Sequence, residues 1–78
     1  MKELLELLIK RLVDNPDGAT VEEKQEADIV RLKVKTDQKD IGKVIGKKGQ
    51  TVGALRTIMK AVGAKENNKR VIIDIDEF

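Results

Sequence analysis

Two glycines and two lysines stand together near the middle of the chain, in the stretch V-I-G-K-K-G-Q-T-V of residues 44–52. Gly46 and Gly49 bracket the lysines, and glycine is favoured where the backbone bends sharply or another chain comes close. Lys47 and Lys48 have no obvious packing role and would add charge at the tip of the bend. A helix expected after the bend would add free N–H groups, which attract phosphate. The stretch therefore predicts a phosphate-binding turn, with a plain corner between two helices as the alternative.

The distribution of charge also favours an anionic partner. The chain of 78 residues has a formal net charge of +2, but residues 37–70 hold 9 Lys and Arg against 3 Asp and Glu. Residues 1–36 hold 7 against 8, and residues 71–78 hold 3 acidic residues and no basic one. The positive field is thus concentrated around the glycines, although a solvated lysine-rich face would give the same counts.

The composition argues against catalysis. The chain has no histidine and no cysteine, which removes the commonest general base, the commonest metal ligand and every thiolate site. The local carboxylate cluster of Asp74, Asp76 and Glu77 lies at the end of an expected strand, where two solvated carboxylates hold a divalent ion poorly. We therefore expect no enzyme activity, no cofactor and no metal. The lack of cysteine fits a cytoplasmic protein.

Hydrophobic periodicity predicts three helices and three strands. Glu3 and Glu6 interrupt the apolar N-terminal run, which indicates an amphipathic helix rather than a signal peptide. No stretch approaches the roughly 20 apolar residues of a membrane helix, so we expect no membrane partner. Thr36-Asp37 is the expected start signal of the second helix. The expected helices are residues 2–13, 39–45 and 50–65, the expected strands are residues 19–25, 29–35 and 70–76, and turns are expected at 14–18, 26–28 and 66–69.

The order α-β-β-α-α-β predicts a single two-layer α+β domain over residues 1–78. One face of a three-stranded sheet would pack on three helices, and the other face would be solvated. The first two strands should form an antiparallel hairpin. The last two are separated by a two-helix crossover and should be parallel if they are neighbours. We therefore expect a mixed sheet.

The residues around the glycines resemble the core of a KH domain, in which an I-G-x-x-G loop is followed by apolar residues three and six positions after the second glycine. Here residues 45–49 are followed by Val52 and Leu55. The order of elements is similar to the type II arrangement, with residues 1–27 as an N-terminal α-β extension and residues 28–78 as the β-α-α-β core. Over nearly its whole length the chain resembles the small bacterial single-KH proteins of the KhpA type. The matching segments are an N-P-D stop, the I-G-K-V-I-G-K-x-G core, an L-R-T-I run and an A-K-E-N…K-R-V segment.

The resemblance implies non-catalytic binding of single-stranded RNA in the cytoplasm, as a post-transcriptional regulator or RNA chaperone with a role in cell shape. In KH domains the G-x-x-G loop clamps about four nucleotides of backbone, and no residue here excludes single-stranded DNA. The implied contacts are Ile41, Gly42, Lys43, Val44, Ile45, Gly46, Lys47, Lys48, Gly49, Val52 and Arg56. In KH domains a strand and its adjoining loop usually form the opposite wall of the RNA-binding groove. Arg31, Lys33 or Arg70 are candidates for contacts there. For each of them, an ordinary exposed charge on a strand is an equal alternative.

A domain of this kind should bind RNA weakly. Phe78 is the only aromatic residue, and each missing base stack is worth about 1–3 kcal/mol. A second binding unit would raise avidity, and the resemblance implies a homodimer or a heteromer with a larger KH-containing RNA-binding protein. Ala54, Ile58 and Ala61 form the candidate dimer surface, unless Ile58 widens the core face of its helix. The alternative function is an adaptor that acts by dimerisation and keeps only a vestigial nucleic-acid loop.

Overall fold

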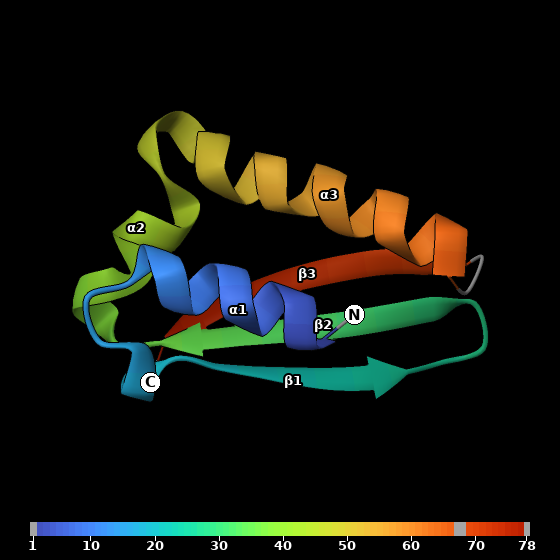
Figure 1. Cartoon of the computed structure of the whole chain (residues 1–78), viewed down its shortest axis with the longest axis horizontal. Helices are drawn as coiled ribbons and strands as arrows, with labels where there is room; N and C mark the ends of the chain where they lie inside the picture. The colour runs from blue at the N-terminus through green and yellow to red at the C-terminus, as the bar shows by residue number, and fades with distance from the viewer. Residues whose placement is uncertain (1, 67–68, 78) are drawn as a thin grey trace.

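A three-stranded sheet and the helices on one of its faces make up the molecule (Figure 1). This computed structural model describes residues 2–66 and 69–77, so part of the turn expected at 66–69 and Phe78 lie outside the described residues. The order of elements is the expected one. The helices are α1 (Lys2–Leu12), α2 (Ile41–Ile45) and α3 (Gln50–Glu66), the strands are β1 (Thr20–Gln25), β2 (Ile29–Thr36) and β3 (Arg70–Glu77), and single 3-10 turns occupy Pro16–Gly18, Gln38–Asp40 and Lys47–Gly49.

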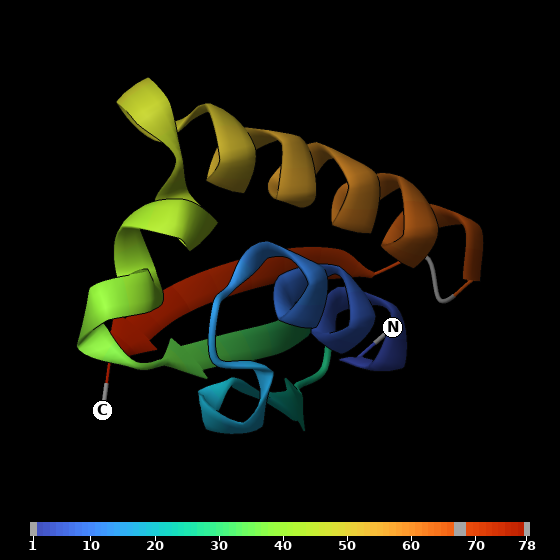
Figure 2. The ribbon, with the colours of Figure 1, turned by 60° about the vertical axis from the view of Figure 1, so that its left-hand side comes forward.

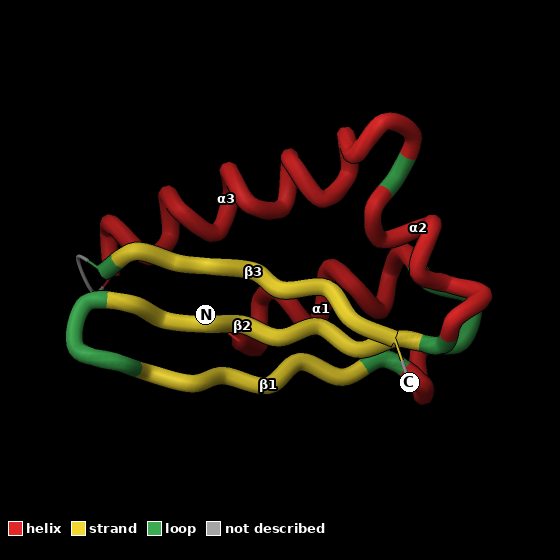
Figure 3. The backbone as a smooth tube through the Cα atoms, turned by 180° about the vertical axis from the view of Figure 1, so that it is seen from behind, coloured by secondary structure: helices red, strands yellow, loops and turns green. Residues whose placement is uncertain are grey.

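The sheet is mixed, as the sequence predicts. Its strand order is β1-β2-β3, with β1 antiparallel and β3 parallel to the central strand β2. The hairpin closes where the Glu26 N–H donates to the Ile29 carbonyl at 2.8 Å. Figure 3 shows the three strands from the side that no helix covers. Because β3 has no strand neighbour on its outer side, one of its edges is free to face α3.

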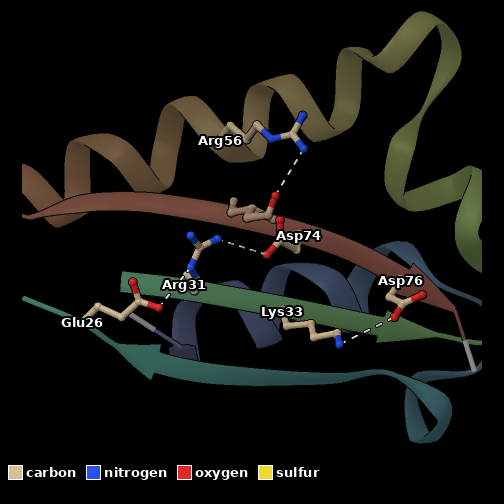
Figure 4. Close-up of polar contacts among 7 residues, drawn as sticks. Glu26, Arg31, Lys33, Arg56, Asp74 and Asp76 are labelled. Atoms are coloured by element: carbon tan, nitrogen blue, oxygen red, sulfur yellow. Dashed lines mark hydrogen bonds and ion pairs between the residues drawn. The ribbon is translucent and has the colours of Figure 1, made fainter. Parts of the chain in front are cut away.

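The alternation of apolar and charged residues along β2 separates the two faces of the sheet. Val30, Leu32 and Val34 are fully buried. The helices pack against them through Leu5, Ile9 and Met59, which are also fully buried. On the outer face, Arg31 pairs with Asp74 at 3.9 Å and Lys33 with Asp76 at 3.8 Å (Figure 4). Such exposed pairs add little stability, but they neutralise these cations. No helix within residues 2–66 is long and apolar enough to cross a membrane.

The predicted start of the second helix is wrong. Thr36 is the last residue of β2, and Asp37 precedes a 3-10 turn without forming a side-chain cap. The α-helix begins only at Ile41. The Asp37 carboxylate instead accepts a hydrogen bond from Asn15 Nδ2 at 2.6 Å. A partner distant in sequence has taken the side chain that local capping would have used.

A buried carboxylate joins the segment after α1 to the start of α2. The Asp40 side chain is 1% exposed. Its Oδ1 accepts the Asp14 N–H at 3.3 Å and its Oδ2 accepts the Asn15 N–H at 3.1 Å. An ion pair between Lys43 and Asp14 forms a second link between the same segments. These contacts set the position of α2 relative to the N-terminal extension.

We expect Asp40→Ala to lower the free energy of unfolding by about 2–3 kcal/mol, because it removes a charged acceptor from two backbone N–H groups. Urea denaturation followed by circular dichroism measures the loss. Asp17→Ala is the matched control, because Asp17 is exposed and its side chain accepts no hydrogen bond from another described residue. This substitution should change the free energy of unfolding by less than about 0.5 kcal/mol. Equal effects of the two substitutions would contradict the role given to Asp40.

Candidate nucleic-acid interface

The two glycines lie in a tight connection between α2 and α3. The Gly46 N–H donates to the Gly42 carbonyl at 2.8 Å and closes α2, and the Gly49 N–H donates to the Gly46 carbonyl at 3.1 Å. Helix α3 then begins at Gln50. In Figures 1 and 2 the connection projects away from the sheet at one end of the molecule. The turn is therefore open to a ligand from solvent.

The two glycines meet different constraints. Both have positive φ, +78° at Gly46 and +74° at Gly49. A Cβ at Gly46 would lie 2.2 Å from Thr51 Oγ1 and 2.8 Å from the Thr51 nitrogen, whereas a Cβ at Gly49 would meet nothing within 4 Å. Gly46 is thus required by both backbone conformation and close packing on Thr51. Gly49 is required by conformation alone.

The two lysines of the turn project into solvent. Lys47 and Lys48 are exposed, and neither side chain forms a hydrogen bond or ion pair with another described residue. Lys48 has φ 56° and ψ 26°, a left-handed conformation that is uncommon outside glycine. Such conformations cluster at functional sites, where the surrounding structure imposes them. Both ammonium groups are available to an external anion.

Lys43 is in a different position from these lysines. Its ammonium group contacts the Asp14 carboxylate. The hydrogen bond from Lys43, together with its charge, holds the pKa of Asp14 below its ordinary value. An RNA phosphate would have to compete with Asp14 for Lys43. Its first role is therefore to link α2 to the segment after α1.

An open groove of about 620 Å³ runs between α3 and β3. Arg56, Lys60 and Ala64 line it from α3, and residues 69–74 line it from the side of β3. Arg56 Nη2 donates to the Ile73 carbonyl at 3.3 Å and so spans the groove (Figure 4). The groove contains basic groups and apolar surface together, which suits a ligand with both phosphates and bases.

The three candidates for the opposite wall of the groove lie in different places. Arg70 lines the groove, whereas Arg31 and Lys33 lie on the outer sheet face in ion pairs. Lys69 also lines the groove, although it is not among the residues predicted from the sequence to bind RNA. Its ammonium group donates to Gln25 Oε1 at 3.3 Å, 44 positions away in the sequence, so no local signal identified it.

The apolar candidates near the turn divide by burial. Ile45 is 38% exposed, whereas Val44 is fully buried and Val52 is 7% exposed. The Val44 side chain belongs to the core beneath α2, so it presents no surface to RNA, and a contact through the Val44 backbone stays a prediction. Ile41 is half-buried and Gly42 is exposed. Of the apolar side chains in α2, Ile45 presents the most surface beside the turn.

The fold and the turn together define a type II KH domain, a class of small nucleic-acid-binding module. The order of elements, the mixed sheet and the G-x-x-G turn between two helices all match this class. The chain belongs to the KH-domain family of KhpA and KhpB, since the model of that family matches residues 2–75.

Curated relatives support the same assignment. The chain is 47% identical over 75 residues to the RNA-binding protein KhpA of Clostridium acetobutylicum, and 44% identical over 75 residues to that of Clostridium perfringens. Each alignment covers 96% of this chain and 99% of the relative. The KhpA of Aquifex aeolicus is 43% identical over 77 residues, covering 99% of this chain and 96% of the relative. No solved structure gives a significant match.

We expect alanine to be tolerated better at Gly49 than at Gly46. Gly49→Ala should cost about 1–2 kcal/mol of unfolding free energy, the penalty of a left-handed backbone alone. Gly46→Ala should cost clearly more, because the clash with Thr51 involves its backbone nitrogen. Chemical denaturation of the two variants side by side makes the comparison. Similar losses would show that the packing of Gly46 on Thr51 is unimportant.

Proposed function

We propose that this protein binds single-stranded RNA without catalysis, using the turn of residues 46–49 as a clamp for the backbone. One observation carries the proposal. Lys47 and Lys48 are exposed and without a partner among the described residues, on a turn that projects from the fold. The family assignment supports it, since the matched relatives are named RNA-binding proteins. We further propose a cytoplasmic role in RNA regulation or as an RNA chaperone.

Two parts of the interface would have separate tasks. Phosphate contacts at the turn position the strand and make binding sensitive to salt. The groove between α3 and β3 then receives bases against Arg56, Arg70 and the apolar surface of β3. The groove residues include no aromatic side chain, so base stacking contributes little. A single domain should therefore bind with low affinity.

A second copy of the chain would raise that affinity, and α3 offers a surface for it. Arg56 and Lys60 each follow a buried residue and face the groove, whereas Ile58 precedes buried Met59 and lies on the opposite flank of the helix. Ile58 is 44% exposed, which favours a surface contact over a wider core face. Ala54 and Ala61 on α3 are also exposed. We propose that this flank forms a two-fold dimer contact.

Dimerisation through this flank would leave both turns and both grooves free. Linking two weak sites increases the effective concentration of the second site. The same flank could receive a larger KH-containing protein, which would replace the homodimer with a heteromer. The alternative function is an adaptor that acts by dimerisation and keeps only a vestigial nucleic-acid site. The exposed Ile58 would favour this alternative only if the protein is found not to bind RNA.

We expect the double variant Lys47→Asp/Lys48→Asp to lower the affinity for a mixed-sequence single-stranded RNA by at least about tenfold, because two charge-assisted contacts are lost. The dependence of log affinity on log salt should become shallower by about 1.4, since each phosphate contact contributes about 0.7 on single strands. Fluorescence anisotropy at several salt concentrations measures both quantities.

The matched control for this test is Lys10→Asp/Lys24→Asp, which makes the same change in charge on α1 and β1. It should weaken binding far less, and circular dichroism should show native folding for both variants. If the two double variants bind alike, the turn is only a corner between helices.

We expect Ile58→Asp to produce a folded monomer, because a carboxylate would be desolvated in an apolar contact. Sedimentation velocity gives the oligomeric state, and circular dichroism gives the fold. Ala64→Asp, at an exposed position on the groove side of the same helix, should leave the dimer intact. Unfolding of Ile58→Asp would place Ile58 in the core. A variant that stays dimeric, or a wild type that is monomeric throughout, would refute this surface.

A further inference from the structure

The contact between Asp14 and Lys43 lies close to the glycine turn. Lys43 is in α2, less than one helical turn before Gly46, and its ammonium group donates to Asp14 Oδ2. Asp14 belongs to the segment after α1, which runs beside α2 in Figures 1 and 2. The side chains of Asp14 and Lys43 are 73% and 44% exposed. The pair therefore forms at the surface, where a phosphate from solvent can reach it.

The two segments stay joined without the Asp14 side chain. The Asp14 N–H donates to Asp40 Oδ1 at 3.3 Å, and the Asn15 N–H donates to Asp40 Oδ2 at 3.1 Å. Both bonds use the backbone of the segment after α1, so they remain when the ion pair opens. The ion pair itself is exposed, and such pairs contribute little to stability. What the Asp14 carboxylate mainly changes is the charge that Lys43 presents to solvent.

An RNA strand held at the turn would meet this pair. Lys47 and Lys48 have no side-chain partner among the described residues, whereas Lys43 is already paired with a carboxylate. The hydrogen bond from Lys43 and the charges of Lys43 and Lys39 lower the pKa of Asp14, so this carboxyl is ionised at neutral pH. A phosphate can contact Lys43 only by displacing Asp14, and the displaced carboxylate would then repel the phosphate.

We propose, on the basis of the RNA-binding function above, that Asp14 is an autoinhibitory residue, which limits the affinity of the turn for RNA by occupying Lys43. In the wild type, Lys47 and Lys48 hold the RNA backbone while Lys43 stays with Asp14. Without the carboxylate, Lys43 becomes a further cation for the backbone beside the turn. The ion pair thus sets how much positive charge this end of the molecule offers to RNA.

The experiment measures binding of a mixed-sequence single-stranded RNA by fluorescence anisotropy at several salt concentrations. We expect Asp14→Asn to raise the affinity about threefold, within the range that one exposed ion pair provides. The dependence of log affinity on log salt should become steeper by about 0.7, because one phosphate contact is added. Asp14→Ser should give the same gain. Circular dichroism should show native folding for both variants, because the backbone bonds to Asp40 remain.

Lys43→Met provides the second arm of a double-mutant cycle. This substitution alone should leave the affinity for RNA nearly unchanged, and adding Asp14→Asn to it should produce no gain. The matched control for charge is Asp17→Asn. Asp17 is an exposed carboxylate in the same segment, and it forms no ion pair with Lys43. Its substitution should change the affinity much less than Asp14→Asn does.

Several results would overturn this inference. An equal gain from Asp17→Asn would show only a general effect of charge. A gain from Asp14→Asn that persists in the Lys43→Met background would show that Lys43 is not involved. Unchanged or weaker binding by both Asp14 variants, or their unfolding, would make Asp14 a structural link only. Each of these results leaves the proposed function standing, whereas absence of RNA binding by the wild type and every variant overturns that function as well.

Discussion

The position of the glycine turn depends on one buried carboxylate. Asp40 accepts two backbone N–H groups from the segment after α1, and it lies directly before α2. A buried acceptor of this kind must be satisfied, so the chain cannot move α2 without breaking both bonds. The five residues of α2 are too few to be stable alone. The N-terminal extension therefore serves as the support on which α2 and the turn after it are held.

Ion pairs outside the glycine turn neutralise several of the cations on the surface. Arg31 and Lys33 are paired with carboxylates of β3 on the outer sheet face, and Lys43 is paired with Asp14. In the turn of residues 46–49, the side chains of Lys47 and Lys48 are exposed and form no ion pair with another described residue. A net charge of only +2 is thus compatible with a local site for an anion, because carboxylates neutralise some of the cations and leave those of the turn charged.

Helix α3 has a buried stripe with an exposed flank on each side of it. Its inward stripe, including Leu55 and Met59, is buried in the core. One flank faces β3 and lines the groove with Arg56. The other flank exposes Ile58. Because the two flanks lie on opposite sides of the buried stripe, the proposed dimer contact on one flank would not obstruct the proposed RNA site on the other.

The sequence by itself determined the elements, their order and the mixed sheet, because the helical and strand periods and the two glycines are local signals. Lys47 and Lys48 were also recognisable, since a turn leaves its side chains exposed. The burial of Val44, the hydrogen bond of Asp37 to Asn15 and the capping of Ile73 by Arg56 were decided only by the tertiary structure. The Arg56 contact joins residues 17 positions apart through a β3 edge. Such contacts depend on strand pairing and helix packing, which no short stretch of sequence specifies.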